Sequence, residues 1–188
     1  MSIVRLPRYE EFPEIDLYAD QVISYLNTHL EFFQLDETKP IITGTMINNY
    51  VKQKVIPRPE KKKYNRDHIG YLFVICILKN VYSISEIADL LMYQATFAEN
   101  AQAYNRFCVE LETCIEHSFN QQNPPIAEER SAGSKLLCQV TTSVSHKLFV
   151  EKVINKYKKE GKNLPILNMD EIENFANYIN NMIDKRVG

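Results

Sequence analysis

Two adjacent asparagines, Asn48 and Asn49, are the side chains of this sequence best suited to reading a nucleic acid. An asparagine amide can make two hydrogen bonds to one adenine in the major groove of DNA. Thr43 and Thr45 stand just before them, at the start of a predicted helix, where a hydroxyl and the helix dipole together can hold a phosphate. The alternative for the asparagine pair is an exposed polar face or a capping role.

A basic block surrounds these residues. Residues 39–68 hold eight basic side chains against two acidic ones, whereas residues 1–38 hold two basic against eight acidic, and the 188-residue chain has a net charge of only −2. Such a block is typical of a surface that binds a polyanion. The candidate phosphate-binding residues are Lys52, Lys54, Arg58, Lys61, Lys62, Lys63, Tyr64 and Arg66. The alternatives are a solvated loop neutralised by the acidic segment and, for Tyr50 and Tyr64, packing in the core.

Other reactive residues point to no catalytic or metal site. Cys76, Cys108, Cys114 and Cys138 form no Cys-x-x-Cys pair, and a site made of Cys108, Cys114 and His117 is disfavoured because the two cysteines lie on nearly opposite sides of one helix. We expect packed thiols, no metal and no cofactor.

Catalytic patterns are also missing. Ser143, Ser145 and His146 occupy helical positions that do not face one another, and no nucleophile elbow surrounds them. The acidic group at residues 170–173 is explained by helix capping. The glycine-rich phosphate motifs are absent, so we expect a protein that is not an enzyme.

The hydrophobic pattern predicts an all-α fold. Helical periodicity runs over residues 14–33, and Thr43 caps a second helix through residue 51. Prolines make residues 56–59 extended, and a lysine-rich hairpin or wing follows at residues 60–64. Residues 65–78 are apolar on nearly all sides, which predicts a buried helix. A Ser83/Glu86 capping box begins the next helix.

The second half of the chain contains a heptad repeat. The repeat follows Phe97, Ala101, Tyr104, Cys108, Leu111 and Ile115, and it predicts a seam between two copies of the chain. The alternative is that two further helices, over residues 137–157 and 168–183, bury this stripe within one chain. We expect a domain at residues 1–94 and a helical dimerisation or effector region at residues 95–188, with a linker at 121–130. Phe97, Tyr104 and Phe107 could line a pocket for a small-molecule effector.

Residues 43–92 resemble the DNA-binding domain of the MerR-type winged helix-turn-helix regulators. Residues 46–50 (M-I-N-N-Y) stand at the recognition helix, 55–57 (V-I-P) after it, 62–64 (K-K-Y) at the wing, and 81–87 (V-Y-S-I-S-E-I) at the following helix. The glycine that follows the recognition helix in that family is Lys54 here. The resemblance implies a transcriptional regulator that binds duplex DNA, and the alternative is a protein-interaction module whose basic wing binds an acidic partner.

A longer stretch, about residues 5–150, resembles a bacterial family catalogued as domain of unknown function 1836. The shared blocks are T-M-I-N-N-Y at residues 45–50, P-x-x-K-K-Y at 59–64 and S-I-x-x-I-x-x-L-L at 83–91. This resemblance implies a cytoplasmic protein of helix-turn-helix ancestry. The first residues do not resemble a signal peptide, and the longest apolar run, residues 69–78, is too short to cross a bilayer. We therefore expect no membrane association.

Overall fold

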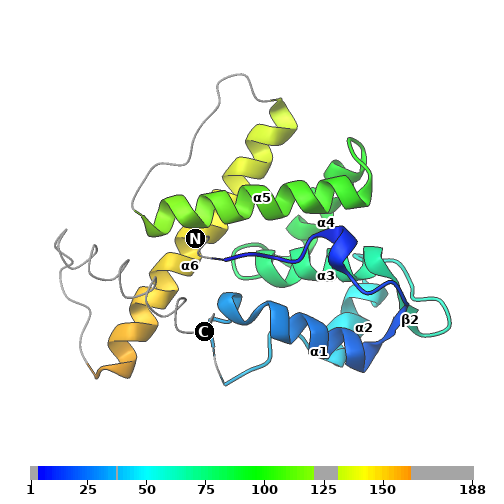
Figure 1. Ribbon diagram of the computed structural model, residues 1–188, viewed down its shortest axis with the longest axis horizontal. Coiled ribbons are helices and arrows are strands. Elements are labelled where there is room, and N and C mark those ends of the chain that lie inside the picture. Colours follow the sequence, from blue (N-terminus) through cyan, green and yellow to red (C-terminus); the bar gives the residue numbers. More distant parts are fainter. Residues whose placement is uncertain (1–3, 37, 121–130, 162–188) are drawn as a thin grey trace. The chain divides into compact units, whose positions relative to one another are not determined.

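The computed structural model describes residues 4–36, 38–120 and 131–161, and it confirms the all-α class. Figure 1 shows the elements. The helices are α1 (Ala19–His29), α2 (Gly44–Lys52), α3 (Arg66–Leu78), α4 (Ile84–Ala95), α5 (Asn100–Phe119) and α6 (Ala132–Lys159), with two single 3-10 turns at Tyr9–Glu11 and Glu31–Phe33 and two short strands, β1 (Leu17–Tyr18) and β2 (Lys63–Tyr64). The predicted linker at 121–130 and the predicted helix at 168–183 lie outside the described residues.

The chain divides into two compact units, and the first is Leu6–Val109. The second contains residues 110–119 of α5 together with α6. The expected boundary after residue 94 therefore moves to the middle of α5. The reason is that the first half of α5 belongs to the core of the first unit: Tyr104 donates a hydrogen bond to the Pro7 carbonyl at 3.0 Å, and its ring lies 4.9 Å from that of Phe12.

Helix α3 is the centre of the first unit. Its residues from Leu72 through Leu78 are all buried, as the all-round apolar sequence predicts. The ring of Phe73 stacks on Phe12 at 5.5 Å, so the amino-terminal segment closes over the same helix. Asn65 caps α3 by accepting a hydrogen bond from the His68 amide, and Ser83 caps α4 through the predicted box with Glu86.

The helix expected from residue 14 begins only at Ala19. Leu17 and Tyr18 instead form β1, which pairs antiparallel with β2 in the register Leu17 with Tyr64 and Tyr18 with Lys63. These partners are far apart along the chain, so local periodicity cannot reveal the pairing. This small sheet ties the segment before α1 to the basic hairpin.

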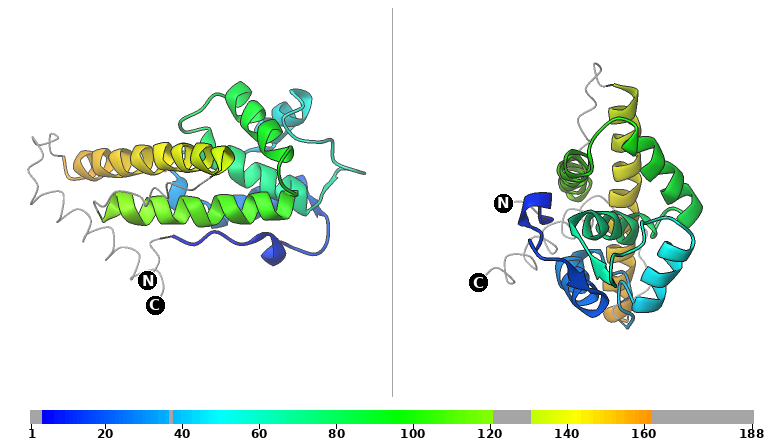
Figure 2. Two further views of the ribbon diagram at one scale, coloured as in Figure 1. Left: turned by 90° about the horizontal axis from the view of Figure 1, so that it is seen from above. Right: turned by 90° about the vertical axis from the view of Figure 1, so that its right-hand side faces the viewer.

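In the second unit α6 crosses α5 obliquely, with the two helices running in the same general direction (Figures 1 and 2). The contacts advance in the same direction on both helices: Cys114 meets Thr141 at 3.3 Å, Ser118 meets Ser145 at 2.8 Å, and the Phe119 ring meets that of Phe149 at 5.3 Å. Ser145, one of the residues considered for catalysis, is therefore a buried partner in helix packing.

Most of the heptad stripe expected to form a seam between copies is buried within one chain. Tyr104, Cys108, Leu111 and Ile115 are each at most 5% exposed within a single chain, Ala101 is half-buried, and only Phe97 is open, at 67%. Four of the six stripe residues thus pack within one chain, while the alternative's second helix, over residues 168–183, lies outside the described residues. None of the described helices is both long enough and apolar enough to cross a membrane.

Replacing Leu111 with glutamate should lower the free energy of unfolding by about 3 kcal/mol or more, because it buries a carboxylate in the core. Val109→Glu is the matched control on the same helix, since Val109 is 53% exposed, and its effect should stay within about 0.5 kcal/mol. Urea unfolding followed by circular dichroism measures both. A Leu111→Glu protein of unchanged stability and halved mass in sedimentation would instead place this stripe between two copies.

Candidate nucleic-acid interface

The position of α2 is fixed by polar contacts to the loop that precedes it. The Asn27 side chain on α1 accepts hydrogen bonds from the amides of Ile41 at 2.9 Å and Ile42 at 3.4 Å, and it donates to the Ile42 carbonyl at 3.2 Å. The Lys79 ammonium at the end of α3 donates to the Ile41 carbonyl. Burial lowers the pKa of Lys79. The loop between α1 and α2 is thus held from both helices.

Helix α2 has one buried and one exposed face. Ile47 and Tyr50 point into the core at 0% and 5% exposure, which confirms core packing for Tyr50. The predicted base-reading and phosphate-binding side chains of the opposite face are exposed, namely Thr45, Asn48, Asn49 and Lys52. The helix therefore presents amides, a hydroxyl and a cation to solvent without giving up its packing.

Of the two roles expected of Thr43, the structure shows the capping one. Its hydroxyl oxygen accepts a hydrogen bond from the Met46 amide at 3.3 Å, so it is the N-cap of α2. This bond uses the Thr43 oxygen as an acceptor, and the hydroxyl still has its own proton to donate. The phosphate contacts of Thr43 and of the exposed Thr45 therefore stay predictions.

The end of α2 places Lys54 in a left-handed conformation. The amide of Lys54 donates to the Val51 carbonyl at 3.1 Å and that of Val55 to the Tyr50 carbonyl at 2.9 Å. These two bonds form a Schellman motif, and Lys54 occupies its left-handed position with φ of 59°. Glycine is usual there because a Cβ atom is disfavoured at positive φ.

The tip of the basic hairpin holds two more lysines in the left-handed conformation. Lys63 pairs with Glu60 and donates its amide to the Glu60 carbonyl at 2.7 Å, which leaves Lys61 and Lys62 as a two-residue turn. Their φ values are 46° and 64°, as a type I′ turn requires. Such turns favour Asn-Gly, yet both positions here carry exposed lysines. The Lys63 ammonium lies 5.3 Å from the centre of the Tyr18 ring, so its stem runs along β1.

Two of the expected contact residues also belong to the framework of the hairpin. Tyr64 is 4% exposed and its ring lies 5.5 Å from that of His68, edge to face, so the ring packs in the core. Arg66 donates to the carbonyls of Phe12 at 3.1 Å and Pro13 at 3.3 Å. Both side chains thus anchor the hairpin and the amino-terminal segment to α3, and their contact with phosphate stays a prediction.

His68 of α3 packs against Tyr64 of the hairpin and is 5% exposed. Its Nδ1 lies 2.6 Å from the Asn65 side-chain oxygen, and burial lowers the pKa of the ring. The nearby backbone of Arg58 and Pro57 offsets this in part. A neutral His68 thus supports the hairpin from below.

The exposed cations of this surface have no acidic partners among the described residues. Five exposed cations form no salt bridge with the described residues, namely Lys52, Lys54, Arg58, Lys61 and Lys62. Lys39, in contrast, pairs with Asp36 at 3.0 Å. The acidic amino-terminal segment therefore does not neutralise them by direct contact. We call these five residues, with Thr45, Asn48 and Asn49, the basic face. Figures 1 and 2 show α2 and the hairpin at the same end of the first unit.

The expected effector pocket is not assembled. Tyr104 and Phe107 are each 5% exposed and fill the core of the first unit, whereas Phe97 is open and lies 4.9 Å from Tyr93, ring to ring. The three aromatic side chains thus do not line one cavity. The physical reason is that Tyr104 is already packed on Phe12 and bonded to Pro7.

The helical unit that carries the basic face coincides with a known sequence family. The model of the family Domain of unknown function (DUF1836) matches residues 7–107, almost the same span as the compact unit Leu6–Val109. The chain belongs to this family. No curated protein and no solved structure matches it.

Replacing both Lys61 and Lys62 with glycine should raise the free energy of unfolding by about 0.5–1 kcal/mol per position, because glycine tolerates the left-handed turn. Lys52→Gly is the matched control, since it removes the same charge within a regular helix and should lower stability by about 1 kcal/mol. Urea unfolding measures both variants against the wild type. A less stable double-glycine protein would contradict the strain attributed to this turn.

Proposed function

We propose that this protein is a transcriptional regulator that binds duplex DNA through its basic face. In this proposal the first unit is a MerR-like winged helix-turn-helix: α1 and α2 are the helix pair, α2 enters the major groove, and the hairpin at residues 60–63 is the wing. The order of β1, α1, α2, hairpin, α3 and α4 supports it. Fold alone does not determine function, so the proposal depends on the side chains of the face.

The amides of α2 supply the chemistry for reading bases. Asn48 and Asn49 are exposed on a helix whose opposite face is fixed by Ile47 and Tyr50. One of the two can meet an adenine edge while the other contacts the backbone or water, because successive side chains point about 100° apart on a helix. Lys52 lies one turn beyond Asn48, in reach of a flanking phosphate.

The observation that carries the proposal is the set of three exposed lysines at positive φ. Lys54, Lys61 and Lys62 occupy positions where glycine would cost less backbone strain. Strained backbone of this kind clusters at functional sites, where the surrounding structure holds it in place. All three carry charge and none is paired within the described part of the chain. A polyanion is the ligand that uses such charges.

The other candidate, a module that binds an acidic protein, uses the same charges but gives no role to the asparagine pair. A protein partner would need an apolar centre in the contact surface, and the basic face consists of polar and charged side chains. This difference favours DNA over an acidic polypeptide.

The affinity for duplex DNA should fall steeply with salt. If the five exposed cations each meet one phosphate, log K should change with log salt with a slope of about −4.5, and Lys61→Gly with Lys62→Gly should reduce it to about −2.7 on every sequence. Fluorescence anisotropy over a salt series measures both. The control is Lys135→Ala with Lys158→Ala, which removes two exposed lysines from α6 and should leave the slope unchanged.

Absence of duplex binding by the wild-type protein at low salt would refute this function. Stronger binding to a polyglutamate chain than to duplex DNA would favour the acidic-partner module.

The asparagine pair should control preference among sequences. Once binding-site selection with the wild-type protein has defined a preferred duplex, Asn48→Ala or Asn49→Ala should lose about 1–3 kcal/mol of preference over random DNA, while stability changes by less than about 0.5 kcal/mol. Gln102→Ala on α5 is the control, since it removes another exposed amide. Full preference in both asparagine variants would exclude the pair from base reading.

A further inference from the structure

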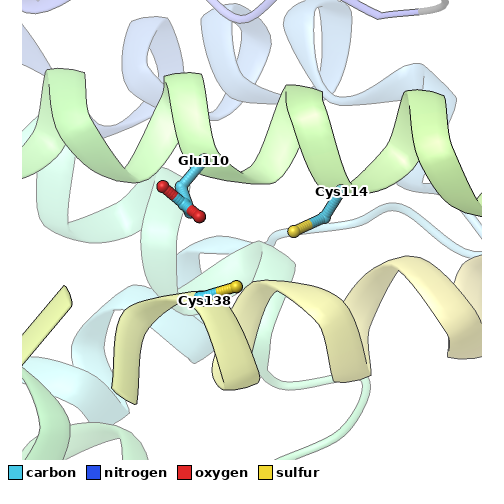
Figure 3. A group of neighbouring side chains, drawn as sticks. All are labelled: Glu110, Cys114 and Cys138. Atoms are coloured by element: carbon cyan, nitrogen blue, oxygen red, sulfur yellow. The ribbon is translucent and has the colours of Figure 1, made fainter. Parts of the chain in front are cut away.

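Three potential metal-binding side chains converge in the second unit. Glu110 and Cys114 lie one helical turn apart on α5, and Cys138 lies on α6 (Figure 3). The carboxylate oxygen and the two sulfurs all lie within 4.8 Å of one another. Figure 3 shows the three side chains pointing into the same space between the two helices.

The packing of α6 against α5 creates this convergence. Glu110 and Cys114 share one face of α5 because they are four residues apart. The contact of Cys114 with Thr141 sets the register of α6, and Cys138 stands three residues before Thr141, again on one face. The Cys114 and Cys138 side chains are almost completely covered, with 1% and 5% exposure, whereas Glu110 is half-buried.

We propose that Glu110, Cys114 and Cys138 bind one thiophilic divalent cation, of which zinc is the natural candidate. Thiolate and carboxylate are accepted zinc ligands, and three protein ligands leave a fourth position for water or another small ligand. Tetrahedral zinc with bonds of about 2.3 Å to sulfur needs the two sulfurs about 3.8 Å apart. The upper bound of 4.8 Å on the separations within the cluster lies about 1 Å above this spacing.

The protons of the two thiols must leave when the cation binds. Burial raises the pKa of Cys138, helped by neighbouring Cys114 and Glu110, so this group is a thiol at neutral pH. Each sulfur would exchange its proton for a bond to the metal, and the two protons go to solvent. The Thr142 hydroxyl lies 3.4 Å from the Cys114 sulfur, and a hydroxyl there can donate to the thiolate that forms.

This proposal is independent of DNA binding because every residue involved belongs to the second unit. The sequence expectation of no metal site tested only Cys108, Cys114 and His117. The structure leaves Cys108 and His117 outside the cluster and brings in Cys138 from the facing helix. The signal that sequence could have offered is the Glu110–Cys114 spacing of four with another cysteine on a second helix.

The test uses the full-length reduced protein, titrated with cobalt(II) and then with zinc(II). Cobalt should bind with 1:1 stoichiometry and give the charge-transfer absorption of thiolate ligands, which zinc then displaces. Cys114→Ala and Cys138→Ala should each abolish that absorption, and Glu110→Gln should weaken binding by about tenfold or more. The affinity should rise with pH, since thiol protons are released when the cation binds.

The matched controls are Cys108→Ala, which removes another buried thiol of α5, and Glu112→Gln, which removes another carboxylate of the same helix. Both should keep wild-type affinity. Cadmium-113 NMR of the wild-type protein keeps the test valid if a cysteine variant does not fold: a shift between those of all-sulfur and all-oxygen sites supports the proposal, and an all-oxygen shift refutes it. Binding that survives in Cys114→Ala, or no binding by the reduced wild-type protein, would also overturn it.

Discussion

Burial of helix α3 on every side is the constraint on which the first unit depends. A helix without a solvent face must be enclosed by other segments, and here the amino-terminal segment, α1, the sheet and the first half of α5 supply that cover. Phe12 stacks on Phe73, and the ring of Tyr104 on α5 contacts both of them. The polar ends of α3 then serve as anchors: Arg66 binds the backbone of Phe12 and Pro13, and Lys79 binds the loop before α2. The orientation of the basic face follows from these anchors.

The basic face consists of a packed core beneath and of exposed cations above. Ile47, Tyr50, Tyr64 and His68 are buried beneath it, whereas the lysines above have no acidic partner among the described residues. Three of those lysines also accept an unfavourable backbone conformation. Charge repulsion and backbone strain both cost free energy in the free protein, and a bound polyanion would relieve the first of them. This is the physical basis for proposing DNA as the ligand of the face.

The second unit follows a different packing principle. Its two helices cross obliquely, and small or hydroxyl-bearing residues occur at their contact, including Ser118, Thr141 and Ser145. Small side chains allow close approach, and the two thiols meet at one level of this contact. The two proposed binding sites thus differ in kind, since the thiols are buried between two helices and the lysines are exposed.

Much of the local structure could be predicted from the sequence alone. Capping patterns and periodicity depend on neighbours within a few residues. They account for the caps at Thr43, Asn65 and Ser83, for the burial of α3 and for the exposure of Asn48 and Asn49. Only the tertiary structure decided which polar side chains contact other parts of the protein. Tyr64 and Arg66 look like ligand-binding residues in the sequence, but they contact α3 and the amino-terminal segment. The pairing of β1 with β2, the burial of the heptad stripe within one chain and the approach of Cys138 to Cys114 were likewise decided by contacts between distant segments. Such contacts depend on the register in which whole elements pack, and this register cannot be predicted from the local pattern of residues.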